Sequence, residues 1–595
     1  MIDAESGPVP SSRFPSRSVP STEWDGSVSP ARPALPHAPA QRRWSAPRRD
    51  GEVVADPPLA DTPRLIQHEH AVRAQRDEAV RVAGWPLNEL RRQARREVAM
   101  CARAFAQRHQ LSPSGLGPLE DGTIPLIVTG HQPEWIHPGV WFKMIAAHAL
   151  ARRVGGAALN VVVDQDLVKR LTIKVPDGRS PDWSPCTLAF DRGAGEAIHE
   201  EWVVHDWDLF RSLAARTREI LGSLVADPIM EPYLTEALRV EGRVTLGERH
   251  TVARARLERA WGWGVDEVAI SAIARTESFR SLLLDLICQA ERFRVLHNAA
   301  LRDHRHRHKI RSRHHPFADL AQSSEGWIET PFWVWSASRP RRRPLLVRRR
   351  GDRVELATPE SLFEGEGRPG PDRFADLPVS PTASASARET LAQLEQAGIK
   401  IRPRAFTTTL FLRWFLADWF LHGIGGAHYD QLGDRIASHW FQAPPPTFGV
   451  LSLTQHLKPG QPDPDAIRRQ RDWINQRLRD LTHHPESLVG TQDICEPARA
   501  QRFDQLIAQK RQWIEAPTAT RAQRAERCRA LRGIRSELAA LLADQRQMWV
   551  AQRAEVESQL ASLLRRTDRE YAIVLHSASQ TRALFQRILV ESGLD

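Results

Sequence analysis

Apolar runs alternate with a helical pattern in the first half of the chain, and together they predict a buried parallel sheet. Residues 124–129 and 158–163 are short, near-continuous apolar runs typical of strands, and 139–153 between them have the pattern of an apolar helix. Strand, turn, helix and strand form a βαβ unit, in which the strands run parallel and are covered on both faces. The sequence therefore predicts an α/β fold with a Rossmann-like parallel-sheet core.

Helical periodicity dominates on either side of this unit. Residues 63–110 predict two helices divided at Pro86, because proline interrupts a helix. The segment 205–300 is also mostly helical in pattern, with expected helices at 209–225, 231–238, 251–261 and 276–298. The further expected elements are strands at 327–335 and 345–356 joined by a turn at 339–343, a helix at 387–397, a strand at 399–402 and a helix at 408–421.

The last quarter of the chain is strongly helical. From 463 to 566, apolar residues between Leu531 and Leu563 largely keep a spacing of three and four, which indicates a coiled-coil seam. The seam fits two arrangements, one packed within the chain against 465–515 and one that joins two copies in a homodimer. A strand at 571–575 and a helix at 579–591 are expected to return to the core.

Four regions follow from these patterns. The Pro-, Ser- and Arg-rich composition of the first region predicts disorder, because too little apolar surface is available to offset the ordering entropy. The regions are a tail at 1–60, an α/β core with helical and β insertions at 61–460, a helical coiled-coil arm at 461–570, and a C-terminal strand and helix at 571–595.

Charge and composition narrow the class of protein. Lys and Arg total 83 against 72 Asp and Glu, a net charge of +11 that raises nucleic acid as a partner. The basic residues are almost all arginines in the tail, the 339–350 segment and the helical arm, where solvation explains them, so the sequence disfavours nucleic acid. It shows no secretory signal and no apolar run long enough to span a bilayer, which predicts a cytoplasmic protein without a membrane partner.

The strongest chemical pattern follows the first predicted strand. Thr129, Gly130, His131 and Gln132 form the turn, and His137 and Lys143 belong to the next helix or its start. Ligands of such sheets bind beyond the carboxyl ends of the strands, where helix N-termini also attract anions. We expect this turn and helix to bind an anionic group, with Lys143 paired to it and His131 as a candidate base.

Two further segments carry candidate site residues. Asp164 and Asp166 end the second strand, and alternate strand positions point the same way, so both carboxylates are expected to face one ligand, one of them as a base. Glycines after the 408–421 helix are expected to form a loop that closes the opposite wall of the site. The candidate binding residues of this loop are Gly425, Gly426, His428, Tyr429 and Asp430.

Metal binding is not expected. The five cysteines are widely spaced, and the alternating His and Arg residues of 302–315 lack the ligand separation of a zinc site. No phosphate-binding loop of the GxxxxGK[ST] type occurs either.

The same residues resemble those of the bacillithiol-biosynthesis cysteine-adding enzymes (BshC-like proteins). The resemblance is carried by Thr129-Gly130-His131-Gln132, His137-Pro138-Gly139, Lys143, Asp164-Gln165-Asp166, and Ile424-Gly425-Gly426 with Tyr429. This family has a Rossmann-like core with a coiled coil, and its assigned reaction adds cysteine to the amino sugar of glucosaminyl-malate. The chain departs from the family pattern at His131, Gln165 and Ala427-His428, which implies a divergent member.

The resemblance implies a ligase-like enzyme of low-molecular-weight thiol biosynthesis, with a small-molecule substrate and ATP or another nucleotide as the candidate cofactor. Two alternatives remain open at the level of sequence. One is a nucleotide-dependent transferase on the same sheet, with phosphate at 130–137. The other is a non-enzymatic scaffold or binding protein built on the coiled coil.

Overall fold

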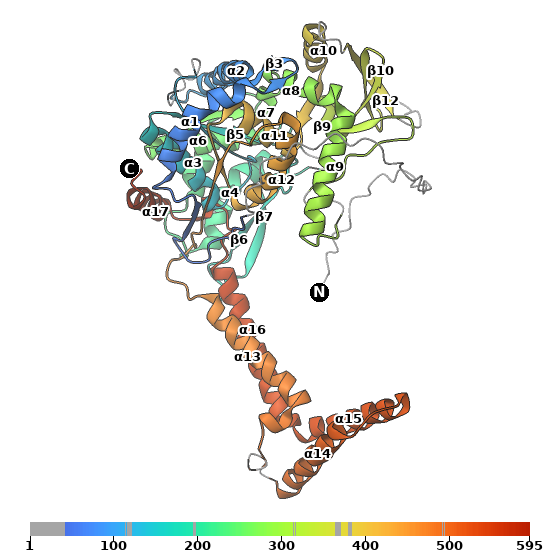
Figure 1. The fold of residues 1–595 in the computed structure, drawn as a ribbon. Helices are drawn as coiled ribbons and strands as arrows, with labels where there is room; N and C mark the ends of the chain where they lie inside the picture. Colours follow the sequence, from blue (N-terminus) through green and yellow to red (C-terminus); the bar gives the residue numbers. More distant parts are fainter. Residues whose placement is uncertain are drawn as a thin grey trace. The chain divides into compact units, whose positions relative to one another are not determined.

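The computed structural model describes residues 42–112, 115, 122–193, 198–312, 315, 317–362, 371–378, 384–490, 492, 494 and 496–595. Figure 1 shows the helices and strands of this chain in sequence colours. The predicted tail lies outside the described residues up to position 41. Its remainder differs from the prediction, because β1 (Val53–Asp56) pairs antiparallel with β15 (Phe448–Leu453) along a full ladder. Two adjacent valines give this short strand its apolar surface. The Pro-rich composition of the neighbouring sequence masked this strand signal.

The core is a six-stranded, mostly parallel sheet. Its strand order is β1-β15-β14-β4-β5-β8, and every neighbouring pair except β1–β15 is parallel. The prediction of an α/β fold with a parallel βαβ unit is therefore confirmed. The parallel strands not yet given are β4 (Leu126–His131), β5 (Ala157–Val162), β8 (Asp266–Ala269) and β14 (Trp419–His422).

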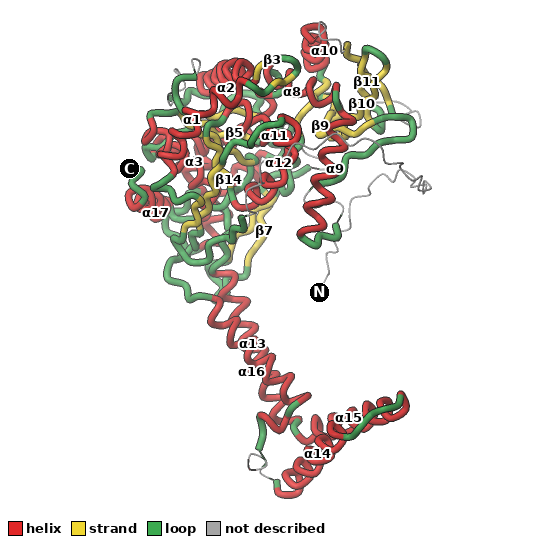
Figure 2. The backbone as a smooth tube through the Cα atoms, in the orientation of Figure 1, coloured by secondary structure: helices red, strands yellow, loops and turns green. Residues whose placement is uncertain are grey.

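Helices cover both faces of this sheet, as the tube in Figure 2 also shows. On one face Ile127 and Trp419 belong to the same apolar cluster as α3 (Pro138–Val154). On the other face Val128 and Phe420 join the cluster of α2 (Leu87–Arg108). The two clusters alternate along each strand because successive strand residues point to opposite faces.

Most predicted helices are confirmed, with ends shifted by a few residues. The structure divides the predicted 276–298 helix into two. These helices are α1 (Thr62–Glu78), α4 (Trp207–Leu221), α5 (Met230–Leu238), α6 (Leu246–Ala260), α8 (Glu277–Cys288), α9 (Ala290–Arg307), α10 (Ser384–Gln396) and α17 (Ala578–Glu591). The elements that the sequence pattern missed include β1, β8, β15, β2 (Arg81–Val82), β3 (Trp85–Pro86), β6 (Thr172–Pro176), β7 (Pro185–Ala189), β12 (Asp372–Pro378), α7 (Ile270–Ile273) and α12 (Ile424–Phe441).

A second, antiparallel sheet has the strand order β12-β11-β10-β9-β13. Its strands are β9 (Ile328–Ser336), β10 (Arg339–Arg350), β11 (Arg353–Thr358), β12 (Asp372–Pro378) and β13 (Ile399–Pro403). The predicted turn at 339–343 is wrong, because these residues lie inside β10 and the connection from β9 is only two residues long. The first residues of β10 alternate between more and less exposed positions, which lets a strand carry so many arginines.

The predicted helix at 408–421 is also wrong in its second half. Helix α11 (Ala405–Phe411) continues into a π-helix, η3 (Leu412–Leu416), and the chain then enters strand β14. The backbone N–H of Leu126 donates to the Asp418 carboxylate over 2.8 Å, which fixes the entry of β14 beside β4. A short apolar run fits a buried strand and a buried helix equally well, so periodicity could not separate the two.

The described residues of the C-terminal arm include four α-helices in two pairs, α13 with α16 and α14 with α15. Figure 1 shows α13 and α16 running side by side. Their bounds are α13 (Pro464–His483), α14 (Pro497–Glu515), α15 (Arg521–Leu541) and α16 (Ala543–Arg566). The predicted seam thus crosses a helix break near Leu542, and coiled-coil packing stays a prediction. The expected strand at 571–575 is wrong, since Ile573–Leu575 is a 3₁₀ turn.

Within the described residues, no helix is both long and apolar enough to cross a membrane.

Candidate functional site at the switch point of the sheet

The strand order of the sheet changes direction between β4 and β14, which makes this a topological switch point. From β4 the chain builds outward through β5 to β8, and it returns much later to place β14 and β15 on the opposite side of β4. Helix α3 follows β4 on one face, whereas α12 (Ile424–Phe441) follows β14 and packs in the cluster of the other face. In open α/β sheets the usual ligand position is a crevice at the carboxyl ends of the two strands beside such a switch point. We use the word crevice for that place in this chain, where the ends of β4 and β14 meet the starts of α3 and α12.

Thr129 and Gly130 build the floor of this crevice. The Thr129 hydroxyl donates to the carbonyl oxygen of Leu421 over 3.0 Å and so links β4 to β14. A Cβ on Gly130 would lie 2.8 Å from the carbonyl oxygen of Val161, so the close approach of β4 and β5 requires glycine here. The prediction that these two residues shape the turn fits their positions, although their role in binding stays a prediction.

Lys143 reaches into the crevice from the second turn of α3. Its side chain is buried, and Nζ lies 3.4 Å from the carbonyl oxygen of Gly130 and 3.9 Å from the point where a Cβ on Gly423 would lie. No carboxylate pairs with it within the described part of the chain. Burial lowers the pKa of Lys143 to about 8, so at neutral pH the group is mostly an ammonium without a counter-charge.

The N-terminus of α12 lies close to this ammonium. Gly423 is the N-cap residue and no side chain caps the helix, so the first N–H groups keep their donor capacity. The N-terminus of α3 differs, because the His137 side chain accepts a hydrogen bond from the Gly139 N–H over 3.1 Å. One N–H at the start of α3 is therefore already occupied, and the anion site predicted there stays a prediction. The predicted glycine loop is wrong, because these residues begin helix α12.

Two histidines near Lys143 are neutral at physiological pH. Burial, followed by the charge of Lys143, lowers the pKa of His131 to about 4. Burial also lowers the pKa of His137 to about 3, with a further contribution from Arg569. The His131 Nδ1 lies 2.9 Å from the Gln132 carbonyl oxygen. The positive potential in the crevice therefore comes from Lys143 and α12, while His131 is available for proton transfer.

A histidine that the sequence reasoning missed completes the crevice. His422 is the last residue of β14, is 4% exposed, and places Nε2 2.7 Å from Oδ2 of Asp430. Asp430 was expected as a binding residue on a loop, but it lies on α12 and faces inward. The only sequence signal was a histidine directly before the glycine run, and no spacing rule connects it to an aspartate eight residues later.

Asp164 and Asp166 do not face a common partner. The Asp164 carboxylate accepts the Ser271 N–H over 3.0 Å, and its burial, reinforced by Glu200, raises its pKa to about 7. Asp166 instead accepts hydrogen bonds from Gln132 and Arg342, both at 3.1 Å. The two carboxylates differ in their protein partners because the chain turns directly after β5, which ends strand alternation at Val162. The expectation of one shared ligand stays a prediction.

His428 and Tyr429 lie on the outer side of α12. The backbone N–H of Trp44 reaches the His428 Nε2 at 3.3 Å. Tyr429 is 40% exposed and packs against Phe317, with ring centroids 5.8 Å apart. Gly425 and Gly426 are exposed in the first turn of the same helix. The structure thus brings Gly426 and Asp430 toward the crevice and gives His428 and Tyr429 other partners.

A small cavity adjoins the β4–α3 turn on the side away from α12. Its volume is about 20 Å³, room for about one water molecule. His131 and Gln132 form one wall, and Trp141 and Asn160 contribute polar atoms without a hydrogen-bond partner in the structure. The cavity is therefore polar, but too small for a whole substrate.

The described residues contain no group of three or more His, Cys, Asp or Glu side chains placed to hold a metal ion. In the His- and Arg-rich segment, the ring centroids of His304 and His308 lie 4.4 Å apart at the end of α9, with the ring planes tilted by 36°. Positions 313 and 314 of that segment lie outside the described residues.

Comparison with known protein families finds no match for this chain, and no curated protein is significantly similar to it. The resemblance to the cysteine-adding enzymes therefore stays a prediction.

Proposed function

We propose that this chain is a divergent cysteine-adding enzyme of the ligase type. It joins the carboxyl group of cysteine, or of a similar carboxylate donor, to the amine of an amino-sugar acceptor in the biosynthesis of a low-molecular-weight thiol. In this proposal the parallel sheet is a Rossmann-like core and the helices α13–α16 form its coiled-coil arm.

The observation that carries the proposal is the unpaired ammonium of Lys143 opposite the uncapped N-terminus of α12. A buried ammonium without a counter-ion is costly, and a bound anion removes that cost. The helix N-terminus adds N–H donors and the positive end of the helix dipole to the same place. A carboxylate of the donor fits this environment, and so does a phosphate group.

Amide formation from a carboxylate needs activation, for which a nucleoside triphosphate such as ATP is the proposed co-reactant. The donor carboxylate attacks the terminal phosphorus of the nucleoside triphosphate and forms an acyl phosphate. The nucleoside diphosphate leaves with the electron pair of the broken P–O bond. The acceptor amine then forms the C–N bond, while phosphate leaves with the electron pair of the C–O bond. The amine gives up one proton to a base, for which the sequence proposes His131 or Asp164.

A nucleotide-dependent transferase is the second candidate, because Lys143 and α12 suit a phosphate group as well as a carboxylate. In that case the nucleotide itself is the group donor. Both candidates use the same crevice and differ in whether cysteine and an amino sugar bind there.

Calorimetric titration of cysteine, glucosaminyl-malate and ATP tests the proposal, together with mass spectrometry of the mixed reactants. We expect an amide product and tight binding of the anionic ligand by the wild type. Lys143→Met removes one charge-assisted contact and should weaken that binding by about 10- to 100-fold. Exposed Lys458 provides the matched control, because Lys458→Met leaves the crevice unchanged.

Equal affinities in Lys143→Met and the wild type would contradict the site. Nucleotide binding without cysteine binding or amide product would instead favour the transferase.

A further inference from the structure

The hydrogen bonds of His422 define which of its nitrogens carries the hydrogen. Burial raises the pKa of Asp430, but its contacts with His422 and Arg413 outweigh this effect and keep the pKa below its ordinary value. Burial also lowers the pKa of His422, which favours the neutral ring with a hydrogen on one nitrogen. An ionised carboxylate only accepts hydrogen bonds. Because Oδ2 of Asp430 lies 2.7 Å from Nε2 of His422, the hydrogen is on Nε2, and Nδ1 has a free lone pair.

That lone pair faces the first turn of α12. A Cβ on Gly426 would lie 3.0 Å from the Nδ1 of His422, in contact with the nitrogen. Gly426 is exposed and, because it has no side chain, leaves the space beside this nitrogen unfilled. In contrast, a Cβ on Gly425 would meet nothing within 4 Å. Of these two glycines, only Gly426 therefore borders Nδ1 of His422.

Arg413 forms an ion pair with Asp430. Its NH1 lies 2.9 Å from Oδ2 of Asp430 and also binds Asp434, while its NH2 donates to the Pro446 carbonyl oxygen. The Thr409 hydroxyl donates to the second carboxylate oxygen of Asp430 over 2.7 Å. Both oxygens of Asp430 are thus fixed, which fixes the plane of the His422 ring in turn.

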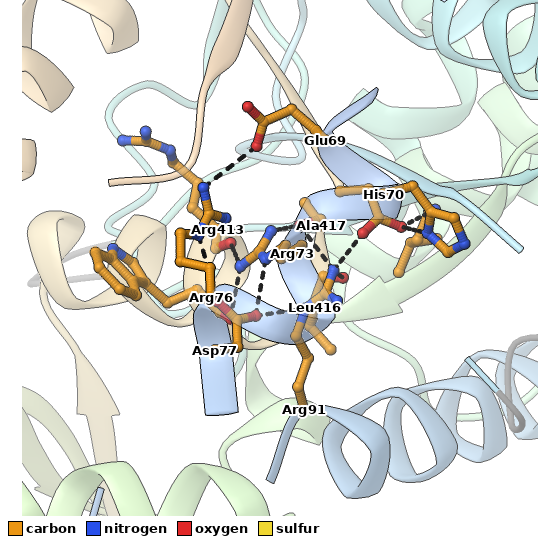
Figure 3. Close-up of polar contacts among 12 residues, drawn as sticks. Glu69, His70, Arg73, Arg76, Asp77, Arg91, Arg413, Leu416 and Ala417 are labelled. Carbon is orange, nitrogen blue, oxygen red and sulfur yellow. Dashed lines mark hydrogen bonds and ion pairs between the residues drawn. The ribbon is translucent and has the colours of Figure 1, made fainter. Parts of the chain in front are cut away.

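The π-helix η3 carries Arg413, and π-turns within helices are frequent at functional sites. Three buried arginines of α1 and α2 bind the carbonyl groups at its end, part of which Figure 3 shows. We name Arg73, Arg91 and Arg95 the arginine clamp. Arg73 binds the carbonyl oxygens of Arg413, Trp414 and Ala417, so the clamp fixes the backbone from which the Arg413 side chain extends.

We propose that Nδ1 of His422 is the base that removes the proton from the acceptor amine, and that Asp430 and Arg413 are its positioning residues. The proton passes from the amine nitrogen to Nδ1 as the C–N bond forms, and the imidazolium then returns it to the departing phosphate. This inference rests on the proposed function and differs from it in naming His422 instead of His131 or Asp164.

Alanine in place of Gly426 tests whether the space beside Nδ1 is needed. Gly426→Ala puts a methyl group against Nδ1 and should lower kcat for amide formation by at least about 100-fold, the usual contribution of a general base. Gly533→Ala adds the same methyl group in open space on α15 of the arm, away from the site, and should leave kcat unchanged. Equal kcat values in the two variants would overturn the assignment.

The ionisation of His422 gives a readout that does not depend on activity. The charged groups facing His422 are Asp430, Arg413 and Lys143; burial lowers its pKa, Asp430 raises it, and the two cations lower it again. Arg413→Met removes one cation and should raise the pKa of His422, whereas Arg413→Lys keeps the charge and should change it less. NMR titration of ¹⁵N-histidine-labelled protein, with His422→Gln to identify the signal, measures both values.

The two experiments fail in different ways. If the wild type forms no amide but the NMR shows a hydrogen on Nε2 and the upward pKa shift in Arg413→Met, the proposed function fails and the positioning network stands. If the amide forms but the hydrogen is on Nδ1, or the pKa does not move, the role of His422 is overturned. In active enzyme, the acid limb of the pH profile for kcat should move upward with the pKa.

Discussion

Asp164 is a single residue whose protonation links the candidate site to stability. Its carboxyl group is buried at the end of β5, and its pKa of about 7 lies well above the value of about 3.9 in an unfolded chain. The folded state therefore binds a proton more tightly than the unfolded state. As pH rises between these two values, the free energy of unfolding decreases, because the buried group must ionise.

Asp164→Asn should therefore stabilise the protein at pH 8 and have little effect at pH 4. Three pKa units correspond to at most about 4 kcal/mol in the free energy of unfolding, and the amide oxygen can still accept the Ser271 N–H. Urea unfolding at the two pH values measures the difference.

Asp166→Asn is the control, and its expected change in the free energy of unfolding at pH 8 has the opposite sign. The hydrogen bond from Gln132 and the charge of Arg342 outweigh burial and lower the pKa of Asp166. Its contribution is present above the unfolded pKa and is lost as pH falls, so Asp166→Asn should destabilise the protein at pH 8. A destabilised Asp164→Asn at pH 8 would contradict the raised pKa of Asp164.

The sequence could predict part of this site and not the rest. Gly130 and Lys143 belong to one local unit of strand, turn and helix, and their positions follow from its periodicity. His422 meets Lys143 only because β14 lies beside β4, which is a property of the sheet order. A residue pattern within one segment contains no information about that neighbour.

Several buried charged side chains meet at the end of η3. The last carbonyl groups of a helix lack partners within it, and here the arginine clamp supplies donors from two other helices. Arg95 donates to the Leu416 carbonyl oxygen over 2.8 Å and to the Asp418 carboxylate over 2.6 Å. The clamp thus joins α1 and α2 to the entrance of the central strand β14.

Arg95→Met should lower the free energy of unfolding by about 3–5 kcal/mol, because it leaves part of a buried ionic network without its partner. Arg96→Met changes the next residue of the same helix, which is exposed, and should cost less than about 0.5 kcal/mol. Guanidinium unfolding curves compare the two variants. Similar losses would mean that the clamp contributes little to stability.

This element also shows why the predicted helix at 408–421 was only half correct. The run is apolar on every side because α11 and η3 are buried and β14 is a central strand covered on both faces. Periodicity cannot distinguish these cases. Asp418 is the residue at which the backbone changes from helix to strand, and its role depends on arginines more than 300 positions earlier.

At the scale of the whole molecule, the arm has an apolar core of its own. Its cluster includes Phe503, Leu506 and Leu538, and it is separate from the two clusters that cover the faces of the sheet. Separate cores allow separate cooperative unfolding. The arm should therefore lose structure in a transition distinct from that of the sheet.

Leu506→Ala should lower the stability of the arm by about 2–5 kcal/mol, because the side chain is fully buried. Hydrogen exchange should rise in α14 and α15 and remain unchanged in β4 and β14. Ile514→Ala on the same helix is the control, since that side chain is 48% exposed. Increased exchange in the sheet of Leu506→Ala would show instead that the arm and the sheet unfold as one unit.

The neighbouring positions of β4 and β14 have a consequence for the order of events during synthesis. Thr129 and the Leu421 carbonyl that accepts its hydroxyl are 292 residues apart. Closing so large a loop makes this contact entropically expensive and slow. Nascent chains that end before β14 contain Lys143 but neither Gly423 nor His422. They have no ligand crevice, so a bound metabolite can stabilise only molecules that have passed this late step.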